Sequence, residues 1–331
     1  MITTRYRLTV PAMLDRAERV FPEREIVSRT PAGIFRYTFL EFAQRVGKLA
    51  SALVASRVRK GDRVATLAWN HHRHLETCFA APAIGAVLHP LNHQLPPAQL
   101  AHTIKRAADK VVVADADLVP QLESVAPSLD TVERYIIMSD GPEIQTRLAH
   151  ATSYEALIGP AGPIRQWPEL DERDVAGICS SSAATELPEQ VAYTHRALRL
   201  ATRAFCLADA FGVTEQDTAL LVAPLFHASA WALPFAAVGM GTRLVLPGPC
   251  PDVKVFGELM GQERVTLAAG VPAVWIDLLA LLEREPYSAS KVRRVLCRAL
   301  PLEDINGVAR IHLPAWDPCR GTPAAAWDNI A

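Results

Sequence analysis

One stretch, residues 178–198, decides how the fold of this chain is interpreted, and it reads ICSSSAATELPEQVAYTHRAL. Its first half is rich in hydroxyl groups, which together with backbone N–H groups can bind a carbonyl or a small anion; they belong to Ser180, Ser181, Ser182 and Thr185. The stretch contains no Gly-x-Ser-x-Gly elbow, which argues against a serine hydrolase. The whole sequence lacks a Walker lysine pattern and a Gly-x-Gly-x-x-Gly, which argues against kinases and Rossmann enzymes.

The same stretch resembles the phosphate-binding loop of the adenylate-forming acyl-CoA synthetases, the AMP-binding family. That loop reads Tyr-Thr-Ser-Gly-Thr-Thr-Gly-x-Pro-Lys-Gly-Val, and in the medium- and long-chain fatty acid ligases it ends with Tyr-Thr-His-Arg. The positions that match are Ser182, Thr185, Pro188, Val191 and residues 193–196. The three loop glycines are replaced by Ala183, Glu186 and Gln190, and the lysine is replaced by Glu189.

These replacements change what the loop can bind. A loop that cradles a polyphosphate needs glycine, so that backbone N–H groups can close on the anion, and it needs a cation to offset the charge. Two carboxylates, Glu186 and Glu189, stand here instead. A like charge a few ångströms from a phosphate costs on the order of several kcal/mol at the effective dielectric of a protein surface. We therefore expect no productive ATP binding, no acyl adenylate and no cofactor.

Two later segments resemble acyl-side motifs of the same family. Residues 224–231 (PLFHASAW) resemble the motif in which an aromatic residue or a histidine lies beside the carboxylate, and residues 269–275 (AGVPAVW) resemble a segment that lines the acyl pocket. The resemblance implies that His227, which follows an expected strand, is the catalytic acid or base. The substrate-binding residues that it implies are Phe226, Ser229, Trp231, Gly270, Val271, Pro272 and Trp275.

The nucleotide side and the end of the chain depart from the family pattern. Where the family has a glycine-rich turn and then Trp-Gly-x-Thr-Glu, this chain has residues 298–301 (RALP) and 315–320 (AWDPCR). The sequence stops at Ala331, before the family's ribose-binding aspartate, hinge and small C-terminal domain. We therefore expect a truncated chain in which the C-terminal domain is absent.

Helical and strand patterns alternate along the chain, which predicts an α/β fold with mostly parallel sheets, in two lobes of residues 1–172 and 173–331. Residues 141–165, broken by Gly and Pro, are expected to form an irregular connection.

His71, His72 and His74 lack the spacing that places two ligands on one helical face, so we expect solvated side chains and no metal site. Helices are expected over 11–21, from an N-cap at Thr38, over 71–84 and over 96–108, and strands over 63–69, 110–114, 220–223, 243–246, 266–269 and 294–297.

Composition excludes several classes of partner. The 331 residues are 50% hydrophobic and 21% charged, as in an ordinary soluble globular protein. A balance of 34 basic and 35 acidic residues leaves a net charge of −1, which argues against binding of nucleic acid or an anionic membrane. No signal peptide or membrane span is found, so a cytoplasmic location is expected. The six cysteines form no Cys-x-x-Cys pair, which argues for reduced, mostly buried thiols.

Three functions from different classes stay open at this point. The first is a repurposed enzyme that acts without ATP on an acyl or polyketide-like substrate by cyclisation, dehydration or thioester chemistry. The second is a non-catalytic pseudoenzyme that binds an acyl ligand or a partner protein, for instance a second copy or a biosynthetic enzyme. The third is an AMP-forming ligase that a separate C-terminal domain completes. The carboxylates of Glu186 and Glu189 argue most directly against the third.

Overall fold

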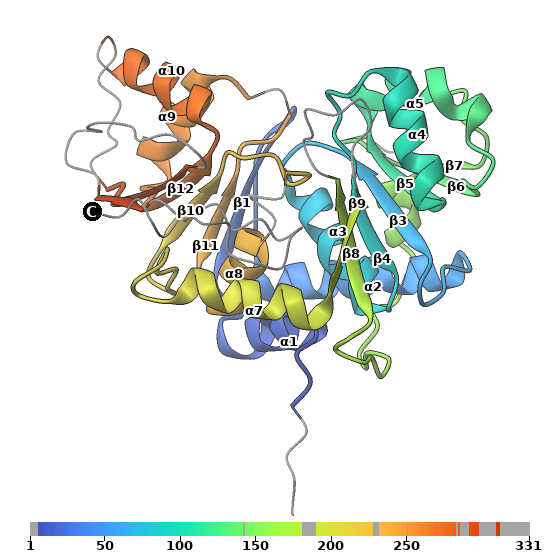
Figure 1. Cartoon of the computed structure of the whole chain (residues 1–331), viewed down its shortest axis with the longest axis horizontal. Coiled ribbons are helices and arrows are strands. Elements are labelled where there is room, and N and C mark those ends of the chain that lie inside the picture. Colours follow the sequence, from blue (N-terminus) through green and yellow to red (C-terminus); the bar gives the residue numbers. More distant parts are fainter. Residues whose placement is uncertain are drawn as a thin grey trace, which may run out of the picture.

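The computed structural model describes residues 6–141, 143–180, 190–227, 232–249, 251–282, 284, 291–297 and 309–311. Within these residues the chain forms two seven-stranded sheets that stand side by side (Figure 1). The first sheet has the strand order β7 (Ala151–Ser153), β6 (Arg134–Met138), β5 (Asp109–Asp115), β3 (Arg63–Leu67), β4 (Val87–Pro90), β8 (Val175–Ser180), β9 (Gln190–Thr194). The second has the order β14 (Ala309–Ile311), β13 (Arg294–Cys297), β12 (Leu267–Gly270), β10 (Thr218–Leu221), β11 (Arg243–Leu246), β1 (Glu25–Thr30), β2 (Gly33–Thr38).

Helices fill the space between the sheets and cover their outer faces. The core between the sheets takes its side chains from α1 (Pro11–Val20), α2 (Phe39–Ala55), α3 (His72–Ala83), α6 (Tyr154–Ile158), α7 (His195–Cys206) and α8 (Ala232–Met240). A second cluster packs α4 (Pro97–Ala107) and α5 (Val119–Val125) on the outer face of the first sheet. A third packs α9 (Val253–Gln262) and α10 (Pro272–Leu282) on the outer face of the second sheet. The result is a layered α/β fold, as the sequence predicts.

Each sheet is parallel except for one antiparallel hairpin, and that hairpin comes from the other half of the chain. The β1–β2 hairpin joins the second sheet because β1 pairs in parallel with β11, with Ile26 opposite Leu244. The β8–β9 hairpin joins the first sheet through the pair Leu88 and Gly177. The sheets therefore exchange strands across residue 172. The division into lobes at that residue stays a prediction, and the sheet pairing does not follow it.

Local signals in the sequence explain where α2 begins. The side-chain oxygen of Thr38 accepts a hydrogen bond from the backbone N–H of Glu41, and the Glu41 carboxylate accepts one from the backbone N–H of Thr38 at 2.7 Å. This capping box satisfies two N–H groups that the helix leaves unpaired. The predicted N-cap at Thr38 is confirmed.

Two expectations about the first half of the chain are wrong. Residues 141–165 contain a short strand and a helix, β7 and α6, because residues 151–153 pair with β6. The three histidines at the start of α3 are buried, with exposed fractions of 5%, 2% and 1% for His71, His72 and His74. This turn lies where the two sheets meet, so it is covered rather than solvated.

Each of these buried histidines has a polar partner. His71 Nε2 lies 2.6 Å from a carboxylate oxygen of Asp115, His72 Nδ1 lies 3.1 Å from Ser28 Oγ, and His74 Nε2 lies 2.9 Å from Thr66 Oγ1. Burial lowers the pKa of His74 to about 4, so its ring is neutral near pH 7. In the described part of the chain, no group of three or more His, Cys, Asp or Glu side chains could hold a metal ion.

Candidate functional site

The segment that follows β10, residues 222–227, is held in place by one asparagine from the other sheet. Asn70 lies just beyond β3 and is 5% exposed. Its side-chain nitrogen donates to the carbonyl oxygens of Leu221 and Ala223, both at 2.8 Å, and its side-chain oxygen accepts from the backbone N–H of Leu225 at 2.9 Å. Its backbone oxygen also accepts from Gly248 N–H at 2.9 Å. Asn70 therefore fixes the exits of β10 and β11 to the exit of β3.

This Asn70 clamp places Phe226 against two rings from the first sheet. The ring centroids of Phe226 and His93 are 5.1 Å apart and nearly perpendicular, and those of His93 and Trp69 are 4.2 Å apart. The indole N–H of Trp69 donates to Asp117 at 2.9 Å, and its backbone N–H donates to Asp115 at 2.8 Å. We call Trp69, His93 and Phe226 the aromatic stack. It is a rigid surface that suits an apolar or planar ligand.

Burial lowers the pKa of His93 below its ordinary value, although the carboxylates of Asp117 and Asp115 act in the opposite direction. The His93 ring is therefore neutral near pH 7 and has one nitrogen that can accept a proton. Sequence reasoning did not single out His93 or Trp69. The available signal is position, since ligands of open α/β sheets bind beyond the carboxyl ends of strands, and these residues follow β4 and β3.

His227 is the residue after Phe226, the member of the aromatic stack that belongs to the second sheet. It is half-buried, and its backbone N–H donates to the carbonyl oxygen of Pro224 at 2.9 Å. The thiol of Cys179, which is buried as predicted, lies 3.5 Å from the carbonyl oxygen of Phe226. The chain therefore brings Phe226 and His227 to the end of β10. Ser229 and Trp231 lie outside the described residues.

The second acyl-side segment lies at the end of β12, next to β10 in the sheet. Gly270 closes β12, and a Cβ atom there would lie 2.8 Å from Cζ2 of Trp275. Trp275 is 2% exposed and packs with the side chains of Phe256 and Leu259. Val271 is half-buried, and Pro272 begins α10. Glycine is needed at position 270 because the indole ring occupies the space of a side chain.

The structure describes only the two ends of the phosphate-loop stretch. Ser180 and Gln190 form the last backbone pair of the β8–β9 hairpin. His195 packs at the start of α7, and its Nδ1 accepts from the backbone N–H of Val10 at 3.2 Å. The predicted residues that lie outside the described part of the chain are Ser181, Ser182, Thr185, Glu186 and Glu189.

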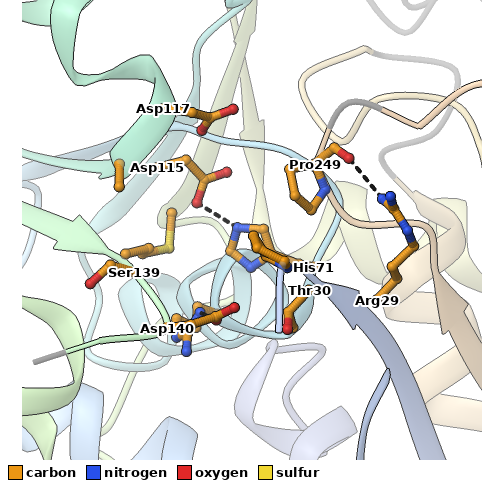
Figure 2. Close-up of a pocket in the computed structure, with 12 residues that line it drawn as sticks. Arg29, Thr30, His71, Asp115, Asp117, Ser139, Asp140 and Pro249 are labelled. Carbon is orange, nitrogen blue, oxygen red and sulfur yellow. Dashed lines mark hydrogen bonds and ion pairs between the residues drawn. The ribbon is translucent and has the colours of Figure 1, made fainter. Parts of the chain in front are cut away.

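A separate cavity of about 240 Å³ lies where the two sheets meet. Figure 2 shows Asp115 and Asp117 of the first sheet on one side of it and Arg29 and Pro249 of the second sheet on the other. The Asp115 carboxylate points to His71, and the Arg29 guanidinium donates to the carbonyl oxygen of Pro249 at 2.9 Å. Each of the two bonds that Figure 2 draws joins residues on the same side of the cavity, so both sheets line the cavity but these bonds do not cross it.

Comparisons with known proteins place this geometry in context. The family described as AMP-binding enzyme matches residues 14–305. A long-chain-fatty-acid–CoA ligase of Thermus thermophilus is 40% identical over 285 residues, which make up 86% of this chain and 51% of that protein. A medium-chain-fatty-acid–CoA ligase of Ectopseudomonas oleovorans is 34% identical over 322 residues, which make up 94% of this chain and 59% of that protein.

Solved structures agree on the fold. A fatty acyl CoA synthetase of Mycobacterium tuberculosis superposes with a TM-score of 0.77 at 23% identity, over 89% of this chain and 55% of that one. A long-chain-fatty-acid–CoA ligase of Archaeoglobus fulgidus gives a TM-score of 0.79 at 21% identity, over 91% and 59% of the two chains. This chain spans about half to three fifths of the length of these proteins. Among the described helices, none combines the length and the apolar character that a membrane crossing requires.

Proposed function

We propose that this chain, which belongs to the AMP-binding enzyme family, holds an acyl or aryl group at the ends of β10 and β12 without forming an acyl adenylate. The observation that carries the proposal is the pair of carboxylates, Glu186 and Glu189, in a loop that resembles a phosphate-binding loop. Their charge repels a polyphosphate, and the loop sequence offers no lysine to offset it. The acyl side, by contrast, keeps a pinned segment and the aromatic stack.

The chemistry that we propose for this site is general acid–base catalysis on the bound acyl group. His227 takes a proton from an activated carbon or a hydroxyl of the ligand and returns it, which suits cyclisation, dehydration or thioester chemistry. Such proton transfer is worth about 10² to 10⁴ in rate. The neutral ring of His93, at the centre of the stack, can accept a hydrogen bond from the polar end of the same ligand.

The proposal is tested by separating ATP binding from acyl binding. We expect isothermal titration with ATP and magnesium to give no heat of binding, and a pyrophosphate-release assay with hexanoate, octanoate, palmitate and benzoate to give no signal. A titration with the same acids and their CoA thioesters is expected to give saturable binding. Saturable ATP binding, or release of pyrophosphate that depends on the acid, contradicts the proposal.

His227→Ala then tests catalysis against mere binding. We expect it to remove turnover of any acyl ligand found in that screen while the melting temperature stays nearly unchanged. His102→Ala on α4, which lies away from both acyl-side segments, is the matched control and should keep full turnover. If His227→Ala keeps full turnover, the residue is structural and the catalytic proposal is wrong. If wild type binds ligands but converts none of them, the chain is a binding protein.

A second candidate function is favoured by the comparisons. Relatives that are 34% and 40% identical are named as fatty-acid–CoA ligases, and this chain spans only part of their length. The chain would then act as the large part of an AMP-forming ligase that a separate domain completes. The pyrophosphate assay distinguishes the two functions when it is repeated with the C-terminal domain of a relative added in trans. Acid-dependent release under those conditions favours the ligase.

A further inference from the structure

A row of polar groups, half-buried at Gln190 and fully buried at its inner end, connects the edge strand β9 to the interior of the first sheet. The side-chain nitrogen of Gln190, the first residue of β9, donates to the carbonyl oxygen of Thr103 in α4 at 2.9 Å. The same nitrogen lies 3.5 Å from Nε2 of His89 in β4. On the other side of the ring, Nδ1 of His89 lies 2.8 and 3.0 Å from the two carboxylate oxygens of Asp109. His89 and Asp109 are both fully buried.

The hydrogen-bond donors and acceptors among Thr103, Gln190, His89 and Asp109 can be assigned in one way. The carbonyl oxygen of Thr103 can only accept, so the nitrogen of the Gln190 amide must face it. The second N–H of that amide then faces Nε2 of His89 at 3.5 Å, a long contact that an unprotonated nitrogen favours and a protonated nitrogen would oppose. The proton of the His89 ring therefore sits on Nδ1, where it is donated to the Asp109 carboxylate.

We infer that Gln190 is a positioning residue: its amide ties the β8–β9 hairpin to α4 and holds His89 in the neutral Nδ1–H tautomer. The hydrogen bond from Gln190 to Thr103 restrains the last backbone pair of the hairpin, which is formed by Ser180 and Gln190. It sets the place at which the chain rejoins the sheet after residue 189. A glycine at this position would have no side chain to make the connection. The inference stands apart from the proposed function, since it requires neither an acyl ligand nor ATP.

The surroundings of Asp109 leave His89 as its hydrogen-bond donor. Burial raises the pKa of Asp109, and the hydrogen bond from His89 and the Arg63 guanidinium oppose that rise. Arg63 itself is occupied by the carbonyl oxygens of Ala107 and Ala108, at 2.6 and 2.8 Å, at the end of α4. A hydrogen bond from His89 is therefore the main support for the carboxylate in this buried place.

Two variants of Gln190 test the inference by different readouts. Gln190→Leu keeps the size of the side chain and removes both donors. We expect roughly fivefold to tenfold faster amide hydrogen exchange in peptides that cover 175–180 and 190–194, because the loss of one or two hydrogen bonds loosens the hairpin locally. Exchange in β13 should not change. Gln166→Leu, at an exposed position in the connection before β8, is the control and should behave as wild type.

Gln190→Glu gives the second readout, because it presents a carboxylate to His89 Nε2 and favours a doubly protonated ring. In protein labelled with ¹⁵N-histidine, the wild type should show one unprotonated and one protonated nitrogen for His89 at neutral pH. The variant should show two protonated nitrogens. The signal is assigned by its loss in His89→Gln. Unchanged exchange in Gln190→Leu, or a wild-type His89 with the proton on Nε2, overturns the inference.

Discussion

Two buried polar clusters stand at opposite ends of the same strand, β10, and they hold different things together. Before the strand, Asp217 is 2% exposed and accepts from Thr214 N–H at 2.9 Å, from Thr266 Oγ1 at 2.7 Å and from Arg293 Nε at 3.0 Å. After the strand, the side chain of Asn70, which follows β3 of the first sheet, donates to the carbonyl oxygens of Leu221 and Ala223. The Asp217 cluster joins β10 to its neighbour β12 and to β13, the next strand beyond β12, within one sheet, whereas the Asn70 clamp joins two sheets.

The two ends of β10 are held by different means, a charged group at the amino end and a neutral amide at the carboxyl end. A charged group at the amino end of β10 can be satisfied by residues that precede the adjacent strands, because all of them are parallel and begin at the same edge. The carboxyl end carries the acyl-side segment, so it is held by a neutral amide whose three hydrogen bonds are directional. A neutral group adds no charge beside a ligand site.

The largest effect is expected from breaking the Asn70 clamp. In Asn70→Leu the leucine side chain is similar in size to asparagine, but it cannot make the three buried hydrogen bonds. We therefore expect a loss of about 3 to 5 kcal/mol in the free energy of unfolding. Urea denaturation followed by circular dichroism measures it. Asn92→Leu is the matched control, since the bond that Asn92 makes within the described part of the chain is a local one to Gln94 N–H in an exposed turn. Equal effects of the two variants would show that the clamp is not what joins the sheets.

The Asp217 cluster gives a smaller effect with a distinct pH dependence. Burial alone would raise the pKa of Asp217, but hydrogen bonds from Arg293, Thr266 and Thr214 outweigh it and hold the pKa below its ordinary value. A lowered pKa in the folded state stabilises the fold above the unfolded pKa of about 3.9, and this contribution is lost as the pH falls through the folded pKa. We expect Asp217→Asn to lower the free energy of unfolding by about 2 to 3 kcal/mol at pH 7, and by less below a pH of about 4.

Denaturation of Asp217→Asn and wild type across this pH range makes the test. Glu123→Gln is the control, since Glu123 forms its ion pair with the highly exposed Arg147 at the surface. Solvent screens exposed pairs of this kind, so they contribute little to stability. A difference between Asp217→Asn and wild type that stays constant from pH 7 to about 3 would contradict a charge-based role for Asp217.

The smallest of the three effects concerns packing at the carboxyl edge, where no charge is involved. Gly270→Ala places a methyl group 2.8 Å from the Trp275 ring, which is buried and cannot move freely. We expect a loss of about 1 to 2 kcal/mol, typical of an overfilled core. Near-ultraviolet circular dichroism should also change, because the tryptophan environment shifts. Gly33→Ala, where nothing lies within 4 Å but φ is +126°, separates backbone strain from crowding.

The sequence predicted elements better than it predicted their neighbours. Arg243–Leu246 and Arg294–Cys297 were predicted to the residue, because short apolar runs between polar turns indicate buried strands. The pairing of β1 with β11 could not be predicted from such runs, since a pattern of period two does not say which strand lies beside it. His72 packs against Ser28 of β1, so its burial depends on where β1 lies, and the local sequence suggested the wrong environment for it.

The candidate site was predictable in part. The family resemblance pointed to residues 224–231 and 269–275, and the structure brings Phe226, His227 and Gly270 to the ends of adjacent strands. Asn70, His93 and Trp69 were not singled out. Each contacts the site across a distance in sequence that no local pattern encodes. Their roles follow only from the contact between the sheets.

The exchange of hairpins between the sheets has a consequence for the order in which the chain is made. The β1–β2 hairpin leaves the ribosome early, yet the parallel neighbour of β1 is β11, and Leu244 is synthesised long after Ile26. An unpaired strand edge is prone to associate with other chains. Ile26 and Val27, both fully buried in the finished fold, must therefore stay soluble while most of the first sheet is translated. Nascent chains that end before residue 243 are the species in which we expect chaperones to bind this hairpin.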